Sequence, residues 1–198
     1  MGASQYSTAL SWSHLHGIGQ NKRRLKLGYG LRFTSYFGSN QNYLTAPAKY
    51  TAKESSIDTL KFTKAQSNAL NISLQIVYSI HKKIDLGFNI DLTGLSFGGT
   101  ENGAFISSIR GTNDFMQKSK PSNFNLLLTG DNDIGNLNSE FYVRYWVNSK
   151  IGIRAGLSYL FTEYTTSNKI NLGNGSIIND RFRNKTALGF IAVSIKPF

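Results

Sequence analysis

The segment 84–93 alternates strictly between apolar and polar residues, and this period constrains the fold more than any other feature of the chain. The polar positions are Asp85, Gly87, Asn89, Asp91 and Thr93, while every position between them is Ile, Leu or Phe. Side chains of a β-strand point alternately to the two faces of its sheet, so this segment is predicted to be a strand with unlike faces. The charged polar face and unbroken apolar face favour a sheet that is apolar outside and polar inside.

The same period recurs along the chain, and it predicts strands at 5–16, 24–37, 70–80, 84–97, 138–147, 151–163 and 185–198. Tight turns at 81–83 and 148–150 alternate with long polar stretches, which are expected to be loops at 38–69, 98–137 and 164–184. The middle stretch is long enough to hold its own hairpin, from 104–110 and 124–129. Short turns at one end and long loops at the other are typical of outer-membrane barrels.

These patterns predict an all-β fold for one domain spanning residues 1–198. The expected architecture is a closed, antiparallel, up-and-down transmembrane β-barrel of about eight strands with a polar, plugged interior. The strand map counts only seven, whereas single-chain bacterial barrels have even numbers. Either a first strand is missing upstream of Met1, or a connection around 98–137 is assigned to the wrong side.

Composition excludes several other classes of protein. No run approaches the roughly 18 apolar residues of a membrane helix. The net charge of +11 is scattered over turns and loops, without a motif for nucleic-acid recognition, so no nucleic-acid partner is expected. Cysteine is absent, which excludes disulfides and thiolate metal sites. Met1 runs directly into a strand-like segment without a signal peptide, so a mature or truncated chain is expected.

Glycines and charges alternate along the predicted polar faces, for example Gly28 and Gly30 beside Arg32. Glycine weakens a strand, so a glycine inside a strand is expected to have a structural role. Either it makes room for long side chains of neighbouring strands, or it forms a bulge or bend. The inward charges are nearly balanced and form a predicted lumen charge network of Lys26, Arg32, Asp85, Asp91, Glu140, Arg144 and Arg154. Asp85, Arg144 and Arg154 lie close to the tight turns, and the two aspartates are expected to pair with arginines. A salt-bridged plug is the favoured interpretation, and a proton or ion pathway is the alternative.

Basic residues also gather in the first and last predicted loops. They are Lys49, Lys53, Lys61, Lys64, Lys169, Arg181 and Arg183. Cationic side chains in such loops would suit contacts with lipopolysaccharide phosphates or with a partner protein.

The C-terminal segment 191–198 ends on Phe198, and a last strand that closes on an aromatic residue resembles the assembly signal of outer-membrane barrels. The segment 135–142 and the hairpin after it are similar to small outer-membrane β-barrel proteins of Bacteroidota, of the OmpA transmembrane-domain and OmpX type. Pro197 departs from this pattern, because it interrupts the alternation and requires a bulge. The resemblance implies a bacterial outer-membrane location, with membrane lipid, lipopolysaccharide and other outer-membrane or cell-surface proteins as partners.

A catalytic or metal site finds little support in the sequence. The three histidines are His14, His16 and His81, and they are predicted to lie on a strand rim or in a turn without chemistry. No catalytic residue, metal or cofactor is therefore expected, and a structural, adhesive or accessory role is favoured. The alternatives left open are a soluble lipocalin-like ligand-binding barrel, an outer-membrane enzyme that modifies lipid A, and a small porin.

Overall fold

The computed structural model describes residues 3–19, 24–46, 48–51, 57–107, 111–128, 132–172 and 177–197. Apart from the short helix α1 (Ala48–Thr51), the regular structure of these residues is all β. The strands in chain order are β1 (Ser4–Ile18), β2 (Leu25–Thr45), β3 (Thr59–His81), β4 (Ile84–Phe97), β5 (Glu101–Ser107), β6 (Gly111–Pro121), β7 (Phe124–Leu126), β8 (Leu137–Trp146), β9 (Ile151–Leu172) and β10 (Ile177–Ile195).

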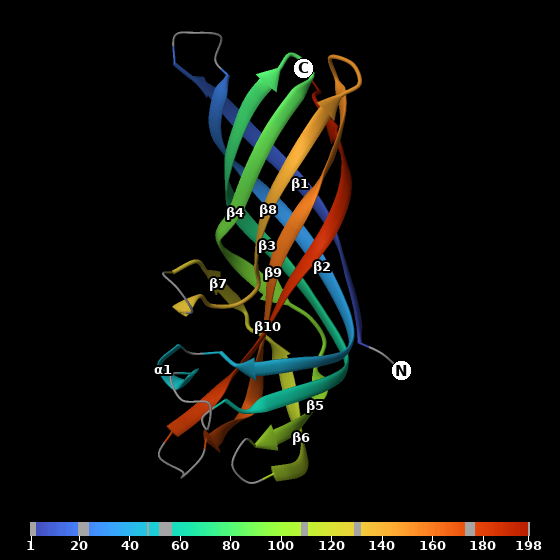
Figure 1. Cartoon of the computed structure of the whole chain (residues 1–198). Helices are drawn as coiled ribbons and strands as arrows, with labels where there is room; N and C mark the ends of the chain where they lie inside the picture. Colours follow the sequence, from blue (N-terminus) through green and yellow to red (C-terminus); the bar gives the residue numbers. More distant parts are fainter. Residues whose placement is uncertain are drawn as a thin grey trace.

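All ten strands belong to one antiparallel, up-and-down sheet (Figure 1). This confirms the part of the prediction that the fold is all β, antiparallel and up-and-down. The prediction that 38–69 and 164–184 are loops is wrong, because β2 and β3 extend far into the first of these stretches, and β9 and β10 extend far into the second. A hairpin does lie in the middle stretch, but it joins β5 to β6, so the predicted pairing of 104–110 with 124–129 is wrong. The short strand β7, which falls in 124–129, pairs with β4 instead.

The upper part of the molecule in Figure 1, here called the seven-strand section, has the pairing order β1–β2–β3–β4–β8–β9–β10. It contains the strands that alternation predicts. Its two outer strands, β1 and β10, are not paired with each other anywhere in the described residues. The sheet therefore has two edges on this side, and β10 meets β2 only below them, at Phe182–Thr45 and Arg183–Leu44.

The lower part, here called the six-strand section, forms a ring through β2, β3, β5, β6, β9 and β10. Its centre is a cluster of buried apolar side chains in which Tyr43, Phe62 and Tyr164 pack ring against ring, with centroids 4.7–5.2 Å apart. Phe105 and Phe182 continue the cluster along β5 and β10. This section has the apolar interior of an ordinary soluble domain.

The strands β2 and β3 change sidedness where the two sections meet. Even-numbered residues such as Arg32 point inward in β2 above this level, and odd-numbered ones such as Tyr43 point inward below it. The pairing register passes from Ser39–Lys64 to Gln41–Phe62, and it skips Asn40 in one strand and Thr63 in the other. Asn40 has a left-handed backbone with φ of 53°, which asparagine tolerates better than most residues. One extra residue in each strand thus rotates both strands by one face.

Inward glycines in the seven-strand section face large side chains of neighbouring strands. A Cβ added to Gly87 would lie 2.1 Å from Cζ of Tyr142, and one added to Gly152 would lie 2.9 Å from Cε3 of Trp146. These two glycines therefore make room for aromatic side chains in the lumen, rather than marking bulges.

Candidate functional site

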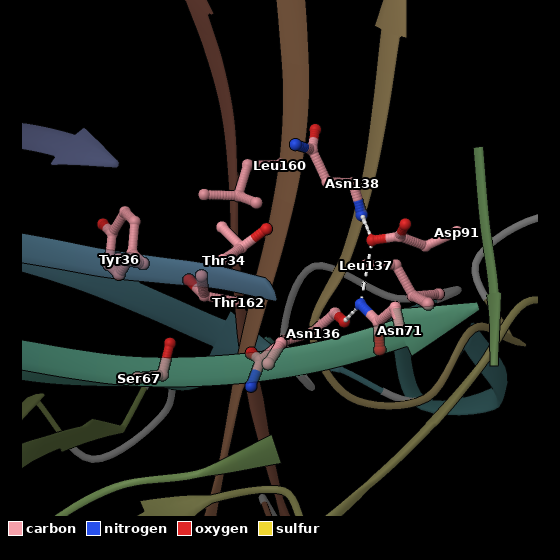
Figure 2. Close-up of a pocket in the computed structure, with 11 residues that line it drawn as sticks. Thr34, Tyr36, Ser67, Asn71, Asp91, Asn136, Leu137, Asn138, Leu160 and Thr162 are labelled. Atoms are coloured by element: carbon pink, nitrogen blue, oxygen red, sulfur yellow. Dashed lines mark hydrogen bonds between the residues drawn. The ribbon is translucent and has the colours of Figure 1, made fainter. Parts of the chain in front are cut away.

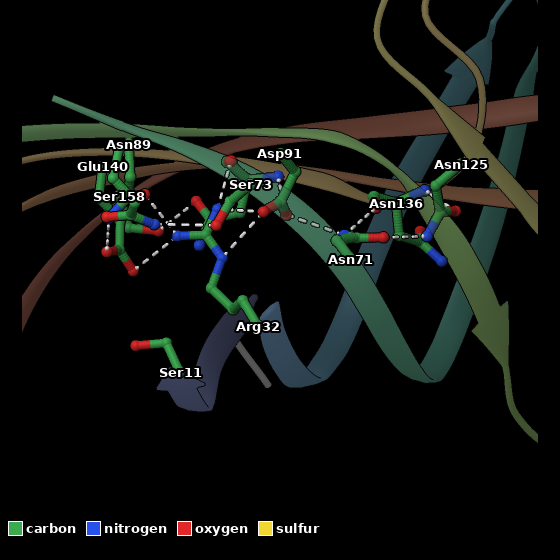
Figure 3. Close-up of polar contacts among 12 residues, drawn as sticks. Ser11, Arg32, Asn71, Ser73, Asn89, Asp91, Asn125, Asn136, Glu140 and Ser158 are labelled. Atoms are coloured by element: carbon green, nitrogen blue, oxygen red, sulfur yellow. Dashed lines mark hydrogen bonds and ion pairs between the residues drawn. The ribbon is translucent and has the colours of Figure 1, made fainter. Parts of the chain in front are cut away.

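Arg32 is at the centre of the polar lumen in the seven-strand section (Figure 3). Its side chain is 2% exposed, and its Nη2 lies 2.6 Å from Oδ1 of Asp91 on β4. Its Nη1 lies 3.2 Å from Oε1 of Glu140 on β8 and donates to Asn89 Oδ1 at 2.6 Å. One guanidinium thus links two carboxylates from two strands, which satisfies the pairing that buried charges require.

Asp91 receives further hydrogen bonds on its other oxygen. Asn71 Nδ2 and the backbone amide of Asn138 donate to Oδ2 at 2.8 and 3.0 Å. Asn125 Nδ2 donates to Asn71 Oδ1 at 2.7 Å, and the amide of Asn136 donates to Asn125 Oδ1 at 2.8 Å. This series of asparagines carries the hydrogen-bond network from the lumen toward the six-strand section (Figure 3).

A second ion pair lies near the tight turns. Arg144 Nη2 is 2.7 Å from Asp85 Oδ2, and the indole of Trp146 donates to the same oxygen at 2.7 Å. Ser79 Oγ donates to Asp85 Oδ1 at 2.6 Å. The carboxylate of Asp85 on β4 is therefore held by side chains of the two neighbouring strands, β3 and β8, at a level different from that of Arg32.

The other two members of the predicted network are bound more loosely. Arg154 is 3.9 Å from Glu140 Oε2 and donates to Ser11 Oγ on β1 at 3.4 Å. Lys26 lies on the inward parity of β2, and no ion pair joins it to another described residue. The lumen therefore holds a tight core around Arg32 and a weaker, more cationic side toward β1 and β10.

The space below Arg32 is nearly filled. Figure 2 shows the residues that line a cavity between Asp91 and Tyr36, which include Thr34, Asn71 and Leu160. Its volume is about 10 Å³, which is near the minimum for one water molecule. At this level of the lumen, the side chains that line the cavity thus leave room for about one water molecule.

A third charge cluster lies on the outward face, at the junction of the two sections. Glu163 on β9 is 0% exposed, and its Oε2 lies 2.9 Å from Nη2 of both Arg181 and Arg183 on β10. The backbone carbonyl of Asp133 accepts hydrogen bonds from both arginines, and the amide of Gly135 donates to Glu163 Oε1 at 3.2 Å. The segment before β8 therefore covers this cluster.

Sequence reasoning missed both Glu163 and the asparagines. Glu163 has the outward parity of an apolar row in β9, so alternation gives no sign that it is buried. Asn125 and Asn136 lie in a polar stretch, where asparagine usually indicates turns. The signal that could have found them is the density of asparagine in this stretch, with five between 123 and 138.

The predicted loop cations are placed in several environments. Arg181 and Arg183 belong to the Glu163 cluster, and Lys61, Lys64 and Lys169 are exposed on strands, so the prediction that they occupy loops is wrong. Lys49 lies in α1 with its Nζ 4.6 Å from the ring centre of Tyr50. Lys53 lies outside the described residues.

The histidines are not part of a cluster of three or more potential metal ligands among the described residues. His14 and His16 lie side by side on the exposed face of β1, with ring centres 4.5 Å apart. The described residues contain no group of three histidine or carboxylate side chains that could hold a metal ion. Likewise, none of their helices has the length and apolar character needed to cross a membrane.

Comparison of the chain with protein-family models, with curated proteins and with solved structures found no match.

Proposed function

We propose that this chain is an integral outer-membrane β-barrel protein with a structural, adhesive or accessory role, and that it is not an enzyme. The observation that carries this proposal is the outward face of the seven-strand section, which is covered by large exposed apolar side chains. They include Leu10, Trp12, Leu27, Tyr29, Leu31, Leu70, Ile72, Leu74, Leu95, Phe141, Val143, Ile153, Leu157, Ile191, Val193 and Ile195.

The contrast between this surface and the lumen beneath it supports a lipid environment. A soluble domain buries its apolar residues and rarely exposes a continuous apolar patch of more than a few hundred Å². Here Ile191 is 81% exposed, whereas Arg32 and Asp91 on the inside are almost fully covered. A lipocalin-like barrel would have the opposite arrangement, with its apolar face around the ligand.

An eighth strand would complete this barrel. Six successive antiparallel pairings lead from β1 to β10, so these two strands run in the same direction. Unpaired backbone groups at a sheet edge are very costly in lipid. A strand antiparallel to both β1 and β10 would pair both edges and raise the count to eight, an even number. This strand would be supplied by a polypeptide segment other than the described residues.

The lumen is proposed to be a plug rather than a pore. The Arg32 network crosses the interior, and the cavity below it has room for about one water molecule. Function would then reside on the outer surfaces. The exposed lysines of the six-strand section suit contacts with lipopolysaccharide or with other outer-membrane or cell-surface proteins.

Detergent dependence tests the membrane assignment. The purified chain should be monodisperse by size-exclusion chromatography with light scattering only in detergent, and it should insert into lipid vesicles. A monodisperse chain in plain buffer would overturn the proposal. Planar-bilayer recordings then test the plug: we expect no conductance from the wild-type chain, and steady single-channel openings would identify a porin instead.

A further inference from the structure

The outer strands of the seven-strand section, β1 and β10, have edges that are not paired with each other in the described residues. These edges are in contact at their lower end, where Thr186 Oγ1 donates to Gln5 Oε1 at 2.8 Å. Above this level, Ser11 and Ser13 of β1 have inward parity, yet both are exposed. Arg32, the partner of Ser11 on β2, is buried. The wall of the lumen is therefore incomplete beside β1.

Three cationic side chains face this incomplete side of the lumen. Lys196 follows β10, and it points inward, because its Nζ lies 3.8 Å from the ring centre of the buried Trp146. Lys26 has inward parity on β2, the neighbour of β1. Arg154 lies on β9, the neighbour of β10, and its Nη2 donates to Ser11 Oγ on β1. All three cations thus lie on the edge strands or on the strands next to them.

The carboxylates of the lumen are engaged with other cations. Asp85 and Asp91 each have an arginine of their own, at 2.7 and 2.6 Å. Glu140 lies 3.2 Å from Nη1 of Arg32, and its other oxygen is 3.9 Å from Nη1 of Arg154. Arg154 therefore has only a long contact with a carboxylate that it shares with a closer arginine.

The two lysines are compensated even less. No ion pair joins Lys26 or Lys196 to another described residue. Lys196 is near enough to Lys26 and Arg144 for their charges to repel it, and the carboxylate of Asp85, which attracts it, already binds Arg144. Positive charge is therefore in excess on the side of the lumen toward β1 and β10.

We propose that β1 and β10 bind one β-strand of another polypeptide segment, and that this strand carries carboxylates on its inward face. The inference rests on the proposed function, because it names the chemistry of the strand that would complete the barrel. The backbone of this strand would pair with both edges, and its outward side chains would continue the apolar surface of Leu10 and Ile191. An uncharged strand would cover the cations without pairing them, which is strongly unfavourable.

The strand directions indicate where these carboxylates belong. Both β1 and β10 run toward the tight turns, so an antiparallel strand between them begins at the turn end, close to Lys196. Ala192, the partner of Arg154 on β10, comes four residues before Lys196. One carboxylate near the start of the strand would therefore meet Lys26 and Lys196, and a second, four residues later, would meet Arg154. Positions four residues apart have the same parity, so both face the lumen.

Three synthetic peptides of about ten residues test the proposal, because this length spans a membrane as a strand. Valine and threonine alternate in each peptide. Two threonines at the spacing given above are replaced by aspartate in the acidic peptide, by asparagine in the neutral one and by lysine in the basic one. Fluorescence anisotropy of labelled peptides measures their binding to the whole chain in uncharged-detergent micelles. The acidic peptide should bind the wild-type chain about tenfold or more tightly than the neutral one, since charged hydrogen bonds are gained.

Charge reversal in the chain should reverse this preference. R154E should bind the basic peptide more tightly than the acidic one, and K196E should reduce the preference for the acidic peptide. K82E is the matched control, because Lys82 is exposed in the turn between β3 and β4, and neither of these strands is next to an open edge. It makes the same change of charge and should leave the preference unaltered. If R154E does not fold, K196E decides, since Lys196 is exposed at the end of β10.

The proposal is overturned if no peptide binds, if the acidic and neutral peptides bind equally, or if K82E changes the preference as much as K196E. A dimer in light scattering that the acidic peptide does not dissociate would place a second copy at these edges, and it would also overturn the proposal. A chain that is monodisperse in plain buffer yet prefers the acidic peptide contradicts only the membrane assignment. A chain that needs detergent but shows no preference contradicts only the acidic strand.

Discussion

The seven-strand and six-strand sections are built in part from the same strands, yet their insides and outsides are exchanged. In the upper part of β3, Asn71, Ser73 and Gln75 point inward while Leu70, Ile72 and Leu74 are exposed. In the lower part, Leu60 and Phe62 point inward while Lys61 and Lys64 are exposed. This difference shows that β-sheet pairing alone does not determine which face of the sheet is polar. One skipped residue in each of two strands is enough to reverse it.

The two sections also differ in the interactions that stabilise their interiors. Apolar burial stabilises the six-strand section without directional partners. The seven-strand section instead buries charges, which are stable only as complete pairs. Its interior should therefore tolerate the loss of one charge far less well than the loss of an unpaired polar side chain.

The largest expected effect comes from breaking the central ion pair. R32M leaves Asp91 buried without its cation and leaves Glu140 with only the 3.9 Å contact to Arg154, which should reduce the free energy of unfolding by about 3–5 kcal/mol. Urea unfolding in detergent micelles, followed by tryptophan fluorescence, measures the change. K26M is the matched control, because Lys26 has the same inward parity but no ion pair in the described residues, and it should cost less than about 1 kcal/mol. Equal effects of the two changes would show that Arg32 acts by packing alone.

The next prediction separates the outward faces of the two sections and depends on the proposed membrane location. L74K places a cation near the centre of the exposed apolar run of β3, and it should cost about 2–4 kcal/mol in lipid bilayers. T63K places the same cation on the exposed side of the lower part of β3, where water would solvate it, and it should change stability by less than about 0.5 kcal/mol. Urea unfolding from vesicles measures both. A harmless L74K would contradict the burial of this face in lipid.

Alternation predicted the seven-strand section because each of its strands has one continuous apolar face, as in 84–97 and 151–163. It could not predict the six-strand section. The inward aromatics there are isolated, such as Tyr43 and Phe62. Apolar residues keep the same parity along β2 and β3 on both sides of the junction, but polar residues such as Gln41, Lys64 and Gln66 interrupt them. The period-two signal is therefore too weak near the junction, and the strands beyond it look like polar loops.

The contacts in the lumen could likewise be predicted from the sequence only in part. The pairing of Asp85 with Arg144 could be anticipated, because both residues lie a few positions from tight turns and so share one level. The pairing of Arg154 with Glu140 could not, because it depends on the stagger between β8 and β9. Stagger is set by hydrogen-bond register, which a single sequence does not reveal.

Alkaline pH should weaken the six-strand section selectively. Burial raises the pKa of Tyr43 well above its ordinary value of 10.0, and burial likewise raises that of Tyr164. The folded state keeps both phenols neutral, so their contribution is complete below pH 10 and is lost above it, as the unfolded tyrosines ionise. At pH 11 the loss should be about 3 kcal/mol, or about 1.4 kcal/mol for each tyrosine.

Hydrogen exchange between pH 8 and 11, corrected for the intrinsic rate at each pH, measures this loss in each section separately. Protection should fall in the lower parts of β2 and β9 before it falls in β4 and β8. The Y43F variant lacks one of the two phenols, so its stability should depend less steeply on pH. A parallel decline in both sections, unchanged in Y43F, would show that these tyrosines do not control alkaline unfolding.

The smallest expected effect tests the residue at which the two sections meet. Asn40 has φ of 53°, a conformation that costs an alanine about 1 kcal/mol and costs glycine almost nothing. Both N40A and N40G remove the asparagine side chain, so the difference between them isolates the backbone term. We expect N40A to be less stable than N40G by about 1 kcal/mol in urea unfolding. Equal stabilities would mean that the chain changes sidedness without a left-handed residue, and that Thr63 alone accommodates the reversal.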